Sequence, residues 1–262
     1  MKCKSILSDS GLYGVDFSIN PYTGCEHGCE YCFASYMRKY TDHSERWGDF
    51  VDVKTNARSV LEDDLMARKR GSILLSSVTD PYQPLEEDHE ITRSILERLA
   101  DTSFPVTVLT KSDLVVRDLD VLQEFSSDRL SVGFTINFLE EEHRKVWEPD
   151  APPIRDRIEA LTRLSEEDIY TYVHVGPHFP GISDLSRIMD ELNPYISELQ
   201  VENLTMRENE ERIMELVRQS YPALEAIYEE IAWDPNAHAV RLRSEIDEID
   251  SRPDTEVSLF LD

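Results

Sequence analysis

The chain has few cysteines and contains no long apolar run. Only four of its 262 residues are cysteine, and three of these fall between positions 25 and 32. Disulfide-stabilised domains are short and secreted, with cysteines spread along the chain, so a disulfide framework is excluded and a reducing, cytoplasmic compartment is expected. No apolar segment of secretory length opens the sequence, and no run reaches about 18 apolar residues, so we expect neither a signal peptide nor a membrane span.

Positive charge is also scarce. The chain has 27 Lys and Arg against 53 Asp and Glu, and its formal net charge is −26. Such a surface repels polyanions and argues against strong non-specific nucleic-acid binding. An acidic surface with little lysine is also typical of an acidic proteome adapted to high internal salt. At molar salt the Debye length falls to about 3 Å. The net charge would then reflect the salt content of the cell and say little about the substrate.

The three clustered cysteines form a C-x3-C-x2-C pattern. Cys25, Cys29 and Cys32 lie close enough to bind three irons of a four-iron cluster, which leaves one iron free for a substrate or cofactor, whereas four cysteines leave none. Two alternatives stay open. One is a structural zinc site completed by His27 or Cys3. The other is an electron-transfer cluster with Cys3 as the fourth ligand.

Short apolar runs alternate with helical patterns of about ten residues, which is typical of parallel βαβ units. The strand candidates are residues 15–20, 72–78, 106–110, 130–136, 170–175 and 199–204. The helix candidates include residues 30–40, 56–70, 91–99, 114–125, 154–164 and 183–192. Six units predict an α/β fold, a partial (β/α)6 TIM-like barrel over 15–207, between an N-terminal arm at 1–14 and a helical C-terminal extension at 208–262.

Polar or Gly/Pro-rich segments follow the predicted strands at their carboxyl ends. The cysteine loop follows the first strand, and the next four strands end in SSVTDP (76–81), TKSD (110–113), TIN (135–137) and GPHFPG (176–181). In parallel α/β folds the reactive groups gather at the carboxyl ends of the strands. We therefore expect these five segments to meet at one rim.

The stretch CEHGCEYC (25–32) resembles the C-x3-C-x-aromatic-C motif of the radical SAM superfamily. Residues 10–185 are similar to its spore photoproduct lyase-like branch, also labelled DNA repair photolyase-like. The similar segments are GVD (14–16) with PYTG (21–24), SVTDPYQP (77–84), LTKSD (109–113), GFTI (133–136) and VGPHFPGISD (175–184).

This resemblance implies an enzyme. Cys25, Cys29 and Cys32 would bind a [4Fe–4S] cluster whose open iron is chelated by S-adenosylmethionine (SAM). One electron, from a donor such as ferredoxin or flavodoxin, would cleave SAM into methionine and a 5′-deoxyadenosyl radical that abstracts hydrogen from a substrate. The cofactors carry this chemistry, and the protein supplies placement and exclusion of water.

The resemblance also implies which residues contact SAM. Tyr31 would lie against the adenine, Lys111 would pair with the carboxylate, and Thr135 would bond the ribose or the carboxylate. The backbone at Gly176 would border the adenine. Two more residues, Ser77 and Asp80, stand where the branch holds the methionyl amino end.

Catalytic residues are not assigned by the resemblance. Two side chains in Pro-flanked rim loops, His178 and Tyr82, are the candidates for substrate contact. Substrate class stays open between a nucleic acid, a peptide and a small molecule.

Two departures from spore photoproduct lyase bear on the reaction. The lyase carries a cysteine after its second strand, which returns hydrogen to a thymine radical, and a tyrosine after its last cluster cysteine. Ser77 and Phe33 stand at those positions here, and a hydroxyl O–H bond is too strong to donate hydrogen easily to a carbon radical. We therefore predict a radical SAM enzyme with an unassigned lyase-like or transferase reaction that is not authentic spore photoproduct lyase. The alternative is a non-catalytic iron–sulfur or zinc-binding module on an α/β scaffold.

Overall fold

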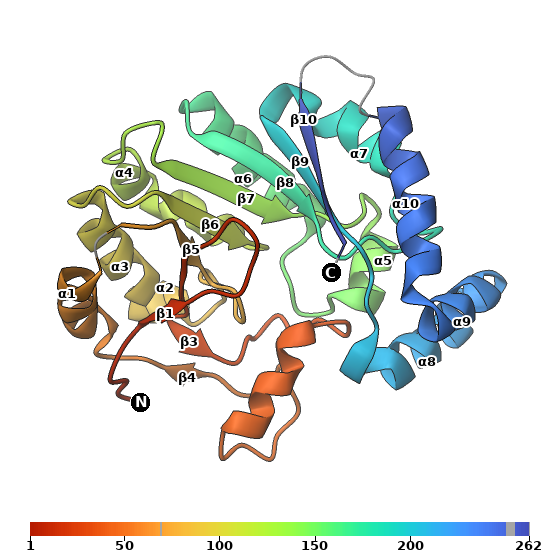
Figure 1. Ribbon diagram of the computed structural model, residues 1–262, viewed down its shortest axis with the longest axis horizontal. Coiled ribbons are helices and arrows are strands. Elements are labelled where there is room, and N and C mark those ends of the chain that lie inside the picture. Colours follow the sequence, from red (N-terminus) through yellow and green to blue (C-terminus); the bar gives the residue numbers. More distant parts are fainter. Residues whose placement is uncertain (69, 250–254, 262) are drawn as a thin grey trace.

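The computed structural model describes residues 1–68, 70–249 and 255–261. An eight-stranded sheet in the order β1-β2-β5-β6-β7-β8-β9-β10 organises it (Figure 1), and a two-stranded sheet pairs β3 with β4. The strands are β1 (Leu7–Asp9), β2 (Phe17–Ile19), β3 (Tyr22–Thr23), β4 (Asp52–Val53), β5 (Ile73–Leu75), β6 (Val106–Thr110), β7 (Leu130–Thr135), β8 (Tyr170–Val175), β9 (Glu198–Glu202) and β10 (Glu256–Phe260).

The six strands expected from the sequence are the six central strands of the large sheet. Strands β2, β5, β6, β7, β8 and β9 pair in parallel, in chain order. They are apolar because helices cover one face of the sheet and the other forms the interior, so strands such as β5 are buried along their whole length. The partial barrel is confirmed, and its sheet stays open between the edge strands β1 and β10.

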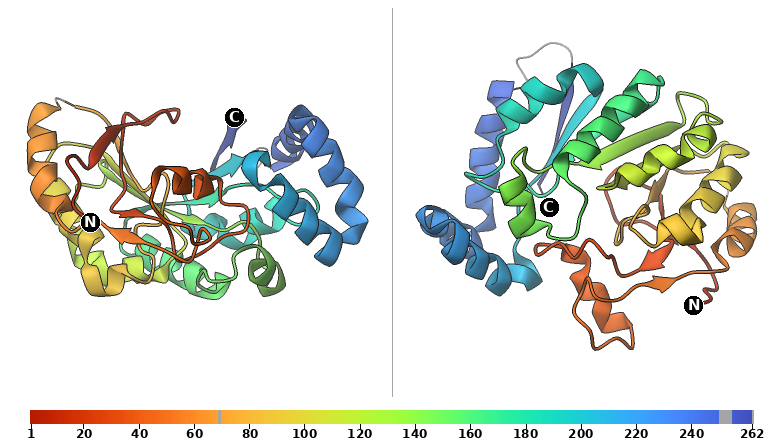
Figure 2. Two further views of the ribbon diagram at one scale, coloured as in Figure 1. Left: turned by 90° about the horizontal axis from the view of Figure 1, so that it is seen from below. Right: turned by 180° about the vertical axis from the view of Figure 1, so that it is seen from behind.

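Helices cover the outer side of the curved sheet. Seen from behind in Figure 2, the yellow-to-green helices α3, α4 and α6 lie over the strands. The α-helices are α1 (Ala57–Ala67), α2 (Glu86–His89), α3 (Ile91–Ala100), α4 (Leu119–Leu122), α5 (Glu141–Trp147), α6 (Ile154–Glu166), α7 (Leu185–Leu192), α8 (Glu210–Ser220), α9 (Glu225–Trp233) and α10 (Pro235–Ile249). The 3-10 helices are η1 (Phe33–Tyr40), η2 (Asp113–Asp118), η3 (Asn193–Tyr195), η4 (Arg207–Asn209) and η5 (Pro222–Leu224).

Two of the predicted helices are not single α-helices in the structure. The segment after the cysteines is the 3-10 helix η1, in which the rings of Phe33 and Tyr36 stack with centroids 6.5 Å apart. A 3-10 helix aligns residues i and i+3, and aromatic side chains lose rotamer freedom in an α-helix. The expected helix at 114–125 divides into η2 and α4, because the Ser112 hydroxyl accepts the Leu114 amide hydrogen and starts a tighter turn.

The two ends of the chain add strands that the sequence did not predict. Within the expected N-terminal arm, β1 pairs antiparallel with β2. The region after residue 207 begins with helices, and α10 packs on α7 and α9, but it then returns to the sheet as β10, parallel to β9. The expected helical extension thus also carries a strand, which the sequence did not indicate because a five-residue edge strand is defined by its pairing with β9 rather than by a strong pattern of its own. Across the described residues, we find no helix with the length and apolar character needed to cross a membrane.

Candidate active site at the carboxyl ends of the strands

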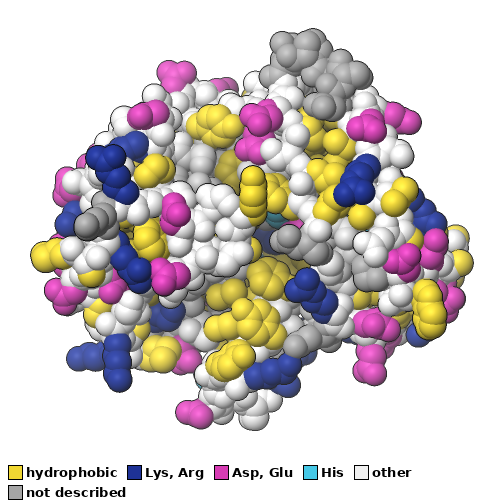
Figure 3. Space-filling view, viewed as in Figure 1, with side chains coloured by type: hydrophobic (Ala, Val, Ile, Leu, Met, Phe, Trp, Pro, Cys, Tyr) yellow, Lys and Arg dark blue, Asp and Glu magenta, His cyan; other side chains and the backbone are white. Residues whose placement is uncertain are grey.

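The cysteine loop and the carboxyl ends of the parallel strands line one cavity, and the face drawn in Figure 3 is hollowed near its centre. The expected convergence of the strand ends is thus present in the structure. The three cysteines and all six residues expected to contact SAM lie on this lining: Cys25, Cys29, Cys32, Tyr31, Ser77, Asp80, Lys111, Thr135 and Gly176.

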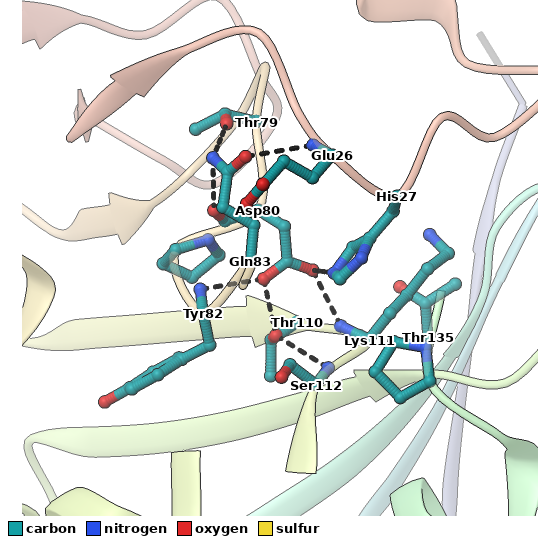
Figure 4. Close-up of polar contacts among 12 residues, drawn as sticks. Glu26, His27, Thr79, Asp80, Tyr82, Gln83, Thr110, Lys111, Ser112 and Thr135 are labelled. Atoms are coloured by element: carbon teal, nitrogen blue, oxygen red, sulfur yellow. Dashed lines mark hydrogen bonds and ion pairs between the residues drawn. The ribbon is translucent and has the colours of Figure 1, made fainter. Parts of the chain in front are cut away.

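The loop after β5 holds the cysteine loop in place (Figure 4). The Thr79 hydroxyl donates to the Gly24 carbonyl oxygen over 2.5 Å, and Gln83 Nε2 donates to Thr79 Oγ1 over 3.0 Å. In return, the Glu26 amide donates to Gln83 Oε1 over 2.9 Å, and the Leu85 amide donates to Glu26 Oε2 over 2.7 Å. These bonds satisfy backbone groups that burial would otherwise leave unpaired, so the TDPYQP segment fixes where the cysteines point.

Asp80 is the centre of the hydrogen bonds drawn in Figure 4. Its Oδ1 accepts from the Tyr82 amide and the Thr110 hydroxyl, while Oδ2 accepts from the Lys111 amide at 2.8 Å and lies 3.2 Å from His27 Nε2. Burial alone would raise the pKa of Asp80, but the charge of His27 and these hydrogen bonds outweigh it and lower the pKa to about 2. The carboxylate therefore joins the cysteine loop to β5 and β6, and its contact with SAM stays a prediction.

A second buried carboxylate, Glu148, contacts Tyr31 and Lys111 but is not itself among the described residues that line the cavity. Its Oε1 accepts from the Tyr31 hydroxyl and from Asn137 Nδ2, and its Oε2 lies 2.6 Å from Arg157 Nη1. Lys111 Nζ is 4.0 Å from Glu148 and 5.6 Å from the centre of the Tyr31 ring. Burial opposes ionisation of Glu148, but Arg157 and Lys111 outweigh it and lower its pKa. The expected adenine-facing residue Tyr31 is thus hydrogen-bonded to a carboxylate that the charges of Arg157 and Lys111 keep ionised.

Sequence analysis missed Glu148 and Arg157. Glu148 follows α5 in a proline-rich segment and belongs to no motif, and Arg157 reads as an ordinary charged residue on a helix. Both side chains are fully buried in the structure. Asn137, which stood at the end of a predicted strand, adds a third connection, because its Oδ1 accepts the Gly176 amide hydrogen over 2.8 Å. It therefore links the ends of β7 and β8.

The cysteine thiols are buried beside a lysine. Burial raises the pKa of the Cys29 thiol to about 12, although the charge of Lys111 opposes the shift. Burial also raises the pKa of Cys32 against Lys111, and it raises the pKa of Cys25 together with the charge of Asp80. Iron binds thiolates, so cluster assembly displaces these protons, and Lys111 offsets part of the resulting negative charge.

The residues present fit an iron–sulfur cluster with a polar ligand beside it. The donor set is three thiols on one cavity lining, and in a four-iron cluster each of them would bind a different iron. Among the described residues, neither these thiols nor any other group of three His, Cys, Asp or Glu is arranged around a single metal ion. Four buried polar atoms on the same lining have neither a hydrogen-bond nor an ion-pair partner among the described residues: His27 Nδ1, Ser76 Oγ, His174 Nδ1 and Asn203 Oδ1. Such atoms are costly unless a ligand or water satisfies them, and Ser76 also has a positive φ of 73°, a strained conformation that is found more often at functional sites.

Gly176 is required by close packing against His174. A Cβ atom at position 176 would lie 1.9 Å from His174 Nε2, so any side chain there would displace the imidazole. In the present position, His174 Nε2 lies 3.4 Å from Glu202 Oε2. Glycine at this position therefore keeps the His174 ring against the cavity lining.

The two candidates for substrate contact lie elsewhere, which corrects that expectation. Tyr82 and His178 are both 0% exposed, and neither is among the described residues that line the cavity. Tyr82 points into the core beneath the strand ends, while His178 faces α10, where its Nε2 lies 3.2 Å from Glu245 and its ring stacks on His238. Loop position suggested exposure, but both side chains turn inward and pack.

The fourth cysteine does not reach the cavity lining. The Cys3 amide donates to Asn56 Oδ1 over 2.9 Å, and the Cys3 thiol lies 3.5 Å from the same oxygen. Asn56 Nδ2 donates back to the Cys3 carbonyl oxygen over 2.9 Å. Cys3 is thus tied to the start of α1, apart from the other three cysteines.

The chain has sequence relatives among known proteins. An uncharacterized protein of Methanocaldococcus jannaschii is 35% identical over 222 residues, which cover 85% of this chain and 83% of the relative. A protein of Pseudomonas phage M6 named radical SAM Nalpha-GlyT isomerase is 25% identical over 181 residues, which cover 66% of this chain and 36% of the phage protein.

Among solved structures, spore photoproduct lyase complexed with dinucleoside spore photoproduct superposes with a TM-score of 0.61 at 16% identity. The match covers 82% of this chain and 63% of the lyase chain, and at this identity it shows a shared fold alone. The sequence model of the radical SAM superfamily matches residues 19–192, which contain the cysteine loop and the strand ends that surround it. The chain therefore belongs to the radical SAM superfamily.

Proposed function

We propose that this protein is a radical SAM enzyme that binds a [4Fe–4S] cluster through Cys25, Cys29 and Cys32 and binds SAM in the adjoining cavity. The observation that carries the proposal is the shared lining. Residues from the cysteine loop and from the carboxyl ends of β5, β6, β7, β8 and β9, up to 180 positions apart in the sequence, meet around one hollow. No role in packing requires three thiols and a lysine to face the same buried space.

When bound by Cys25, Cys29 and Cys32, the cluster would supply the electron for reductive cleavage of SAM, and the radical so formed would abstract hydrogen from the substrate. The residues of this chain hold and orient the reactants. Lys111 places a positive charge beside Cys29 and Cys32, and the charges of Cys29 and Glu148 raise the pKa of Lys111 although burial opposes this. Lys111 therefore stays protonated at neutral pH and can attract the carboxylate of SAM.

Tyr31 is held so that its ring forms a fixed wall of the cavity. Its hydroxyl donates to Glu148, and it accepts from Asn137 Nδ2 over 2.8 Å. Burial and the adjacent charge of Glu148 raise the pKa of Tyr31, so the hydroxyl stays protonated. The edge of the ring meets Phe179 with centroids 5.1 Å apart. A rigid, apolar ring face is suited to stacking against the adenine.

The proposed reaction is not that of spore photoproduct lyase. Ser77 lines the cavity, and its hydroxyl oxygen accepts a hydrogen bond from Asn20 Nδ2 over 3.2 Å. Among the described residues, the cavity lining includes no cysteine beyond the three proposed ligands. A thiol that could return hydrogen to a thymine radical is therefore lacking there, which supports a different fate for the substrate radical.

The test is anaerobic reconstitution with iron and sulfide, followed by dithionite and SAM. We expect 5′-deoxyadenosine and methionine in equal amounts, and neither product from the Cys29→Ser variant. The matched control is Cys3→Ser, which should keep full iron content and activity because Cys3 does not line the cavity. If the wild-type protein carries a full cluster but yields no 5′-deoxyadenosine, the proposal of an enzyme is overturned and a non-catalytic iron–sulfur module is favoured. Zinc bound in place of iron would favour a structural metal site.

A further inference from the structure

A groove with four positively charged side chains lies on the outer side of the cysteine loop. Arg38 and Lys39 reach it from η1, Arg46 from the loop that follows, and Arg212 from α8. Arg38 and Lys39 are exposed, and the side chains of Arg46 and Arg212 are 55% and 39% exposed. In Figure 3, dark-blue side chains gather below the central hollow, where Figure 1 draws η1 and the start of α8.

This groove differs in charge from the rest of the molecule. Its lining carries the four cations and one carboxylate, Glu30, in a chain of net charge −26. Glu30 accepts two hydrogen bonds from Arg212, over 2.8 and 2.9 Å, and lies 3.6 Å from Arg46. Two further carboxylates contact these arginines: Asp49 contacts Arg46, and Glu215 contacts Arg212. Arg38 donates a hydrogen bond to the backbone carbonyl oxygen of Glu45. The lining is therefore net positive within an acidic surface.

The groove also contacts Cys29, a proposed cluster ligand, from outside the cavity. Cys29 lines both the groove and the cavity, and among the described residues no other belongs to both linings. The cysteine loop separates the two spaces. A molecule in the groove therefore lies beside a proposed cluster ligand and outside the cavity proposed for SAM, a position that suits the delivery of an electron.

We propose that this groove is the docking surface for an acidic one-electron carrier protein of the flavodoxin or ferredoxin class. The inference rests on the proposed function, which needs one electron for each SAM cleaved. The carrier loses one electron, the cluster gains it, and no atom is transferred. Two acidic proteins repel each other over most of their surfaces, so the local positive charge directs the encounter to this groove.

The experiment compares two double charge reversals. Arg38→Glu with Lys39→Glu removes positive charge from the groove, and Arg155→Glu with Arg163→Glu makes the same change of net charge on the outer face of α6, where both arginines are exposed. The first readout is the dissociation constant of oxidised flavodoxin for the anaerobically reconstituted protein, measured by biolayer interferometry in 0.1 M salt. We expect at least about tenfold weaker binding for the groove variant and less than about twofold change for the α6 variant.

The second readout separates docking from chemistry. Flavodoxin hydroquinone should support SAM cleavage by the groove variant at least about tenfold more slowly than by wild type, while dithionite, which needs no protein docking, reports whether the cavity is intact. Raising salt to 1 M should reduce the difference between wild type and the groove variant, because the Debye length falls to about 3 Å.

Equal flavodoxin affinities for the two variants would overturn the proposal. So would a single-stranded oligonucleotide that binds wild type, loses affinity with the groove variant and does not compete with flavodoxin, since the groove would then serve a nucleic acid. Failure of the proposed function is distinguishable: dithionite would then yield no 5′-deoxyadenosine from wild type, whatever the flavodoxin affinity.

Discussion

Two buried carboxylates hold the cysteine loop, and they do so with different partners. Asp80, 6% exposed, is satisfied by two backbone amides, the Thr110 hydroxyl and His27. Glu148, 0% exposed, is satisfied by the charge of Arg157 together with the Tyr31 hydroxyl and the Asn137 amide. The first arrangement is largely a hydrogen-bonded loop anchor, and the second is built on an ion pair.

The difference predicts how much stability is lost when a partner of each carboxylate is substituted. A carboxylate held largely by hydrogen bonds from amides and a hydroxyl loses those bonds one at a time, and each is worth about 1 kcal/mol. A buried ion pair loses far more when one partner is removed, because the remaining charge stays in a low-dielectric interior. We therefore expect protein stability to be more sensitive to single substitutions around Glu148 than around Asp80, although both carboxylates position the cysteine loop.

The largest effect is expected for Arg157→Ala. It removes the cation 2.6 Å from Glu148 Oε2 and leaves that carboxylate buried, so the free energy of unfolding should fall by about 3–5 kcal/mol. Urea denaturation at pH 7 measures this. Arg155→Ala, on the exposed face of the same helix, is the control and should change stability little. Similar losses for the two variants would show that Glu148 is not stabilised as an ion pair.

A smaller, pH-dependent effect is expected for Asp80→Asn. The native pKa of Asp80 is about 2, compared with 3.8 for the unperturbed group, which corresponds to about 2 kcal/mol of stability. Because the folded-state pKa is depressed, this stability is present above pH 4 and is lost as the pH falls toward 2. Wild type should therefore exceed Asp80→Asn in stability at pH 7, and the gap should narrow between pH 4 and pH 2.

Denaturation curves collected across that pH range test the Asp80 prediction. Asp63→Asn, at an exposed position on α1, is the control and should follow the wild-type pH dependence. A gap between wild type and Asp80→Asn that stays constant from pH 7 to pH 2 would contradict a lowered pKa at Asp80.

The smallest effect is expected for Tyr31→Phe. The change keeps the ring and removes a hydroxyl that donates to Glu148 and accepts from Asn137, so stability should fall by about 1–2 kcal/mol. Thermal unfolding measures it, with Tyr13→Phe, at an 89% exposed side chain, as the control. In combination with Arg157→Ala the two losses should not add, because both residues act on Glu148; simple additivity would argue against a single cluster.

The parts of the site that the sequence predicted are those defined by local pattern. The spacing of Cys25, Cys29 and Cys32 identified the proposed ligands, and apolar runs located the strands whose ends carry Ser77, Lys111 and Thr135. The missed parts depend on contacts between distant segments. Tyr31 and Glu148 are 117 residues apart, and nothing in the sequence around Glu148 marks it as different from the many exposed glutamates of this acidic chain.

The same distinction explains the two errors at the rim. His178 and Tyr82 follow strands in loops with proline on either side, which indicates a turn but not the direction of the side chain. That direction depends on what packs behind each loop: α10 for His178 and the core for Tyr82. A loop pattern constrains the backbone, while the orientation of a side chain is decided by its tertiary neighbours.

By itself, the sequence determined the superfamily, the six parallel strands and the three proposed cluster ligands, because periodicity and motif spacing are local properties of the chain. The tertiary structure alone decided which charges are buried together, that β10 returns to the sheet, and that a positively charged groove lies behind Cys29. These features depend on the free energy of groups that meet only after folding. A charged group that loses its water is stable only beside an oppositely charged or hydrogen-bonding partner, and the tertiary structure alone determines that partner.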